Sequence, residues 1–162
     1  MAKSLRYMPL LLVLFCTLPV PASEKPIYKL TIDAPVEAAY DSLYAALENE
    51  RFFVVFEANI LKNISRFAER WGADFNKSKL TALRSMVFCN GWYANKVSGE
   101  DPEMTALCPL SVTLIEKDGR TTLLFVKPAL LAKGSPAEGT LREVQQTIIA
   151  VFEKTATLFE GK

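Results

Sequence analysis

The sequence predicts an α+β fold with two layers, in which helices pack on one face of a mostly antiparallel sheet. Two observations indicate this class. Short strand-like runs interchange with segments of helical spacing, in the order strand, helix, strand, helix, strand, hairpin, helix. An Asp-Gly pair also stands between two strand-like runs, which is typical of a tight antiparallel hairpin.

The first half of the chain supplies two strands and two helices. Residues 27–32 alternate apolar and polar side chains, and residues 51–58 are rich in β-branched and aromatic ones. Pro35 opens a helix whose core-facing stripe comprises Val36, Tyr40, Leu43, Tyr44 and Leu47. A second helix is expected between a cap at Asn59 and a stop at Gly72, with Ile60, Ile64, Phe67 and Trp71 at helical spacing.

The second half supplies a third strand, the hairpin and a long helix. Residues 84–89 are predicted as a strand, and residues 90–104 as an irregular segment with at most a short helix. Residues 111–116 and 121–127 pair across Asp118-Gly119, and Pro128 ends the second strand because proline has no N–H for the ladder. The last helix has capping-box patterns at 135–138 and 140–143, and its buried side is marked by Leu141, Val144, Ile148, Val151, Phe152 and Phe159.

The first 22 residues are predicted to be a cleavable signal peptide. Lys3 and Arg6 precede a short apolar run at 10–18, and Val20-Pro21-Ala22 offers small residues for cleavage. The run is about half of the roughly 20 residues that a membrane-spanning helix needs. We therefore expect a periplasmic or secreted protein with one domain at residues 23–162.

The composition excludes several classes of function. The chain has 19 basic and 18 acidic residues, and two of the basic ones lie in the leader, so the mature chain is almost neutral, without the basic patch that nucleic-acid binding requires. It has no histidine, which excludes Ser-His and Cys-His nucleophiles and His-ligated zinc. No catalytic residues are predicted, and a non-enzymatic protein is favoured.

Cys89 and Cys108 are the two cysteines that remain after leader cleavage. In an oxidising compartment the simplest expectation is a disulfide that pins both ends of the segment between them. A reversible redox pair is a second interpretation. A third is a soft-metal site, because Met86, Cys89, Met104 and Cys108 offer the thiolate and thioether ligands that suit Cu(I); a Cys-ligated haem is a related option.

Trp92, Tyr93 and Met104 are the candidate ligand-binding residues of this segment. The two aromatic side chains have the flat surfaces on which a planar ligand stacks. In the alternative interpretation, which we favour for the aromatic pair, they cover a sheet edge or a dimer partner.

The residues from 107 to 128, LCPLSVTLIEKDGRTTLLFVKP, resemble the signature of the domain of unknown function 302 family. The matching positions are Leu107, Pro109, Glu116, Asp118, Gly119 and Pro128. The resemblance implies a compact two-layer domain, often dimeric, with no agreed activity and no catalytic residues to carry over. Typical members lack a cysteine before the proline of the Leu-x-Pro step, and they tend to have a proline after the asparagine that here precedes Gly91. Cys108 and Cys89 fall at these altered positions, which suggests an exported branch with two extra cysteines.

Together these observations favour a small exported binding or accessory protein of unknown ligand, with a disulfide-pinned loop over the sheet. The competing prediction is an extracytoplasmic thiol redox, soft-metal or haem-binding protein that uses Cys89 and Cys108. A third hypothesis is a structural dimer partner for a larger membrane or cytochrome complex. The expected partners are a second copy, a small ligand or another extracytoplasmic protein.

Overall fold

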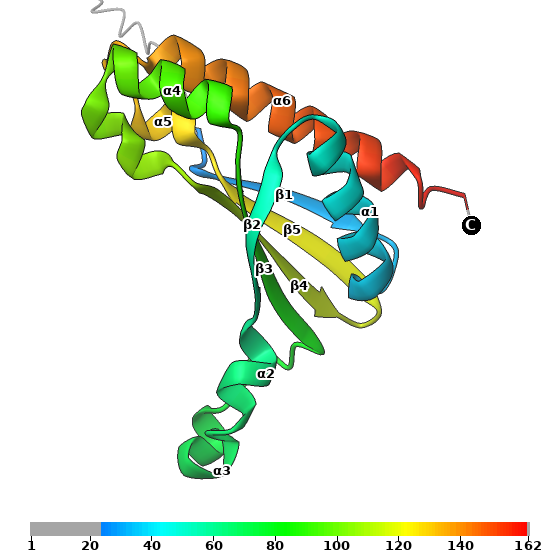
Figure 1. The fold of residues 1–162 in the computed structure, drawn as a ribbon. Helices are drawn as coiled ribbons and strands as arrows, with labels where there is room; N and C mark the ends of the chain where they lie inside the picture. The colour runs from blue at the N-terminus through cyan, green and yellow to red at the C-terminus, as the bar shows by residue number, and fades with distance from the viewer. Residues whose placement is uncertain (1–23, 162) are drawn as a thin grey trace, which may run out of the picture.

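The computed structural model describes residues 24–161, which form a five-stranded antiparallel sheet and a helical layer on one of its faces (Figure 1). The strand order across the sheet is β1-β5-β4-β3-β2. The strands are β1 (Ile27–Ile32), β2 (Phe53–Asn59), β3 (Ala82–Cys89), β4 (Leu110–Lys117) and β5 (Arg120–Val126). The predicted α+β class and its antiparallel sheet are therefore confirmed.

The predicted hairpin joins β4 and β5. Asp118 and Gly119 both have positive φ, 54° and 73°, as the favoured two-residue hairpin turn requires, and Lys117 pairs with Arg120 across it. The turn fixes the register between β4 and β5. The remaining strands are added on either side of this pair, β3 next to β4 and β1 next to β5.

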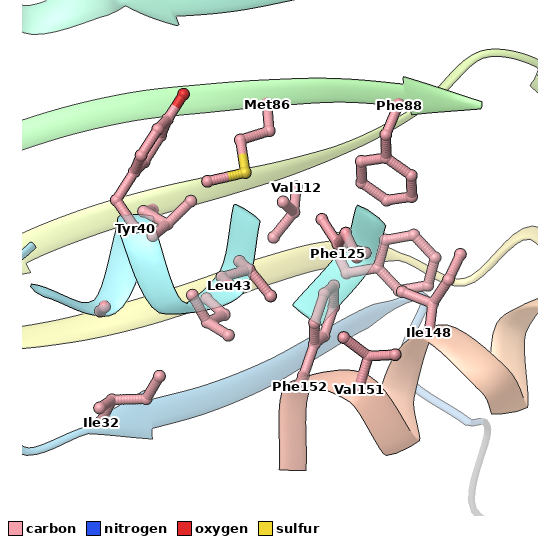
Figure 2. Packing of buried hydrophobic residues seen from close by; sticks show 14 of the residues in the cluster. Ile32, Tyr40, Leu43, Met86, Phe88, Val112, Phe125, Ile148, Val151 and Phe152 are labelled. Atoms are coloured by element: carbon pink, nitrogen blue, oxygen red, sulfur yellow. The ribbon is translucent and has the colours of Figure 1, made fainter. Parts of the chain in front are cut away.

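Two long helices, α1 (Val36–Asn49) and α6 (Glu138–Thr157), cover one face of the sheet (Figure 1). Alternate residues of the strands point at them, among them the fully buried Met86, Phe88, Val112 and Phe125. Figure 2 shows Leu43 of α1 and Phe152 of α6 in the same cluster. The predicted stripe of α1 is correct for Val36, Tyr40, Leu43 and Leu47 but wrong for Tyr44, which is exposed.

The N-terminus of α1 is capped from the sheet. The Glu116 carboxylate on β4 accepts hydrogen bonds from the Val36 N–H at 2.6 Å and from the Thr81 hydroxyl at 2.7 Å. It also brings a negative charge to the positive end of the helix dipole. The contact joins the helix layer to the middle of the sheet.

The second predicted helix is interrupted. It consists of α2 (Ile60–Ser65) and α3 (Ala68–Trp71), followed by the 3-10 turn η1 (Gly72–Asp74), and none of their residues is buried. The Phe67 N–H bonds to the Ile64 carbonyl three residues back, which ends the α-helical ladder there. Figure 1 shows this arm projecting away from the sheet and its helices.

The segment predicted to be irregular is mostly helical. It contains α4 (Gly91–Glu100) and the 3-10 helix η2 (Pro102–Leu107). The Asn90 side chain caps α4 by accepting from the Trp92 and Tyr93 N–H groups. Val97 of α4 packs with Ala132, Ala137 and Leu141 in a small second core, to which Met104 and Leu107 also pack.

A short helix, α5 (Pro128–Leu131), and the start of α6 complete the fold. Sequence reasoning missed α5, although it correctly ended β5 before Pro128. Neither predicted start of the last helix is correct: α6 begins at Glu138, between the two predicted boxes, with Ala137 as an N-cap that makes no side-chain hydrogen bond, and it continues through Gly139. Its predicted buried side is correct for residues 141–152, while Phe159 lies beyond its end and is partly buried.

The predicted leader lies outside the described residues. Within residues 24–161, no helix combines the length and the apolar character that a membrane span needs.

Candidate functional site

Cys89 and Cys108 flank residues 90–107, the segment that contains α4 and η2 and that we call the α4–η2 excursion. Their side chains face each other. Cys89 is the last residue of β3, and Cys108 follows η2 directly, just before a cis peptide bond to Pro109. Their sulfur atoms are 3.2 Å apart as two free thiols. The two ends of the excursion therefore lie side by side, and a covalent bond between the sulfurs would join them.

The surroundings of the Cys108 thiol disfavour a reactive thiolate. Burial raises the pKa of the Cys108 thiol from 9.0 to about 11, and the adjacent Cys89 thiol adds to the shift. A nucleophilic cysteine usually has a lowered pKa beside a cation or at a helix N-terminus. The local chemistry is closer to that of a structural pair.

An apolar pocket lies between the thiols, α4 and α6. Its lining includes Cys89, Cys108, Met104 and Val97, and its volume is about 20 Å³. That is room for about one water molecule, so the pocket in this arrangement does not accommodate a haem or another sizeable ligand.

The predicted soft-metal residues do not all meet. Met104 lines the same pocket as the two cysteines. Met86 is 0% exposed and belongs to the main core, where Figure 2 shows it pointing toward the helix layer. Among residues 24–161 no group of three or more His, Cys, Asp or Glu side chains is placed to hold a metal, so a metal site here would depend on two thiols and one thioether.

The Tyr93 side chain is held in place by contacts with Phe52 and with α6. Its ring stacks on Phe52 with 5.9 Å between the centroids and 11° between the planes. Its hydroxyl donates to Glu143 of α6 at 2.8 Å, and this hydrogen bond raises the pKa of the phenol. Tyr93 therefore connects the first turn of α4 to the core and to α6.

The Trp92 side chain, by contrast, is exposed to solvent. It is 69% exposed and borders a surface hollow of about 530 Å³ whose wall also contains Phe53, Asn90 and Thr147. Phe53, at the start of β2, is 52% exposed and pairs with Cys89 in the sheet register. Thus three chain segments, around residues 50–53, 90–93 and 147, form one concave surface beside the cysteines.

Sequence reasoning missed Phe53 as a site residue. The only available signal was the run FFVVF at 52–56, whose apolar residues do not alternate. In the structure β2 is an edge strand with a bulge between Val54 and Phe56, and Phe53, Val55 and Phe56 are exposed together.

Comparison with known proteins identifies the family and the fold. The sequence matches the family described as "Domain of unknown function DUF302" over residues 28–155. The structure is similar to the crystal structure of an uncharacterized conserved DUF302 protein from Bacillus stearothermophilus, with a TM-score of 0.70 and 18% identity, covering 82% of this chain and 99% of that one. No curated protein matches the sequence significantly. With most of its length matched, this chain belongs to the DUF302 family.

Proposed function

We propose that this chain is an exported, non-enzymatic binding protein whose ligand site is the hollow between Trp92 and Phe53. The observation that supports this proposal is that two exposed aromatic side chains, Trp92 and Phe53, line the same hollow of about 530 Å³. Ligand sites commonly have a volume of about 300–1,000 Å³ and combine apolar walls with a few polar groups.

The lining of the hollow favours a flat ligand with a polar edge. Trp92 and Phe53 offer ring faces, while Glu50, Asn90 and Thr147 offer polar groups around them. An aromatic or otherwise planar ring would stack on the indole and direct its polar substituents to this rim.

A Cys89–Cys108 disulfide would hold the ligand site in place. On export, each thiol would lose its proton, and two electrons would pass to the disulfide of an oxidant protein, which leaves as a dithiol. The 3.2 Å between the sulfurs supports this pairing, and the raised pKa of Cys108 favours a permanent bond over rapid exchange. Because Cys89 pairs with Phe53 in the sheet register, the bond would lie next to one wall of the hollow.

The test compares two tryptophan substitutions. Trp92→Ala is expected to weaken binding of the aromatic dye anilinonaphthalene sulfonate by roughly tenfold, the loss of one stacking contact. Trp71→Ala is the matched control, because Trp71 is also exposed, at 42%, but lies on the projecting arm. Fluorescence titration of both variants, with native mass spectrometry of the purified chain for copurified ligands, measures the effect. Equal affinity of both variants for the dye would exclude the hollow as the binding site.

A second candidate is a thiol redox or soft-metal function at Cys89 and Cys108. The observation in its favour is that Met104 lines the same pocket as the two adjacent sulfurs, which gives Cu(I) three soft donors. Competition for Cu(I) against bicinchoninate tests it: a Met104→Leu variant should lose affinity, and a Met86→Leu variant should not. Equal affinities of the two variants would remove Met104 from the metal site.

A further inference from the structure

The projecting arm, which with its return to β3 comprises residues 60–80, contains no buried residue. It nevertheless has seven large apolar side chains, namely Ile60, Leu61, Ile64, Phe67, Trp71, Phe75 and Leu80. The Phe67 ring stacks on Trp71 with 5.2 Å between the centroids, and the Trp71 ring contacts Phe75 at 6.5 Å. These rings therefore pack on one another rather than on the main core. Figure 1 shows α3, which contains the 42% exposed Trp71, at the end of the arm that lies farthest from the sheet.

The charge of the mature chain is unevenly distributed between the arm and the rest of the molecule. Residues 60–80 contain five basic and two acidic side chains, a net charge of +3, whereas the rest of residues 23–162 contains twelve basic and sixteen acidic ones, a net charge of −4. Lys62, Arg66 and Arg70 recur every four residues, and all three are exposed. Within residues 24–161 none of the three makes an ion pair, so their charges are available to an external anion.

Basic and aromatic side chains adjoin each other along the arm. Arg66 precedes Phe67 in the sequence, and its guanidinium lies over the Phe67 ring, 4.8 Å from the centroid. Arg70 likewise precedes Trp71. Segments that lie at a bilayer surface combine these two kinds of residue, with Lys and Arg at the anionic headgroups and Trp or Phe at the boundary with the acyl chains. A soluble polyanion would neutralise the charges of the arm but would leave its apolar side chains in water.

We propose that the arm binds the surface of an anionic phospholipid bilayer, with Lys62, Arg66 and Arg70 at the lipid phosphates and Trp71 at the level of the headgroups. The rest of the mature chain has a net negative charge, which the same surface repels, so the molecule attaches through the arm.

This attachment leaves the ligand hollow away from the bilayer. Phe53, which borders the hollow, begins β2, and Asn59 ends the strand directly before α2. The strand places about 20 Å between the two residues. The membrane contact does not depend on the ligand site, so the two proposals can fail separately.

Vesicle flotation with the full mature chain tests the membrane contact. The chain should bind vesicles of equal parts phosphatidylglycerol and phosphatidylcholine but not vesicles of phosphatidylcholine alone. Added salt should weaken the binding, because it screens exposed charges. A triple variant with Lys62→Gln, Arg66→Gln and Arg70→Gln should lose affinity for the mixed vesicles by about 100-fold, the combined contribution of three basic side chains near an anionic surface.

A second triple variant, with Lys29→Gln, Lys133→Gln and Lys154→Gln, is the matched control. It removes the same charge from exposed positions outside the arm and should bind the mixed vesicles like the wild-type chain. Circular dichroism should find both triple variants folded, because none of the six side chains is buried.

Trp71 provides a second measurement that leaves the charge unchanged. The chain has two tryptophans, so in a Trp92→Phe background the emission comes from Trp71. Its emission should shift to shorter wavelength when the mixed vesicles are added. Unshifted emission, equal affinity of the two triple variants, or equal binding to both kinds of vesicle would each overturn the proposal. Binding to single-stranded DNA or polyglutamate without binding to the mixed vesicles would also overturn it, and would assign the arm to a soluble polyanion.

Discussion

At the scale of single residues, the family signature is explained by the fold. Glu116 connects the centre of the sheet to the N-terminus of α1, Asp118 and Gly119 form the hairpin turn, and Pro128 begins α5. Pro109 follows Cys108, where the α4–η2 excursion returns to the sheet. Each of these roles is structural.

Glu116→Gln is expected to lower the free energy of unfolding by about 1–2 kcal/mol. Both carboxylate oxygens accept hydrogen bonds, and an amide keeps only one acceptor while losing the charge that favours the helix N-terminus. Urea denaturation monitored by circular dichroism measures the loss.

Glu100→Gln is the matched control for this change. Glu100 is exposed at the end of α4, so its neutralisation should change the stability by less than about 0.5 kcal/mol. Equal effects at the two positions would show that the cap contributes nothing specific to stability.

At the scale of elements, the α4–η2 excursion is where local pattern and structure differ most. Gly91 and Gly99 and a weak apolar period made residues 90–104 resemble a loop. The helix forms because Asn90 caps it and because Val97 packs against Ala132, which follows α5, and against the start of α6, more than 30 positions later in the chain. A prediction from local periodicity cannot detect such tertiary contacts.

The Cys89–Cys108 bond should stabilise this excursion more than the rest of the fold. Closing a loop between residues 19 positions apart contributes about 3 kcal/mol in the chain-entropy model. Hydrogen exchange in α4 and η2 should therefore be up to about 100-fold slower in the oxidised chain than in the reduced chain. Amides in the middle of α1, which belongs to the main core, provide the internal reference.

A Cys89→Ser, Cys108→Ser double variant distinguishes the effect of the bond on hydrogen exchange from any other effect of the reductant. It should exchange like the reduced wild-type chain whether or not a reductant is present. If the oxidised and reduced wild-type chains protected α4 equally, the bond would have no stabilising role there.

At the scale of the whole molecule, the succession of strands and main helices along the chain could be predicted, whereas the order of the strands in the sheet and the surfaces could not. Alternation located β1 and the hairpin, and the helical stripe located α1 and α6. The hollow depends on Phe53, Trp92 and Thr147, which meet only because β2 lies beside β3 at the sheet edge and α4 lies beside α6. Local patterns carry no information on that register, so Phe53 was missed and Trp92 was identified without its partner.

Export and oxidation can be examined in one measurement on the whole chain. If residues 1–22 direct secretion, protein from the extracytoplasmic fraction should have the mass of residues 23–162, less two hydrogen atoms for the Cys89–Cys108 bond. A Leu12→Arg variant places a charge in the apolar run and should stay inside the cell at full length with alkylatable thiols. Intact-mass spectrometry after alkylation distinguishes the two states, because each free thiol adds one reagent mass. Exported chain that keeps residues 1–22 would contradict the leader, and exported chain that takes up two reagent masses at Cys89 and Cys108 would contradict the disulfide.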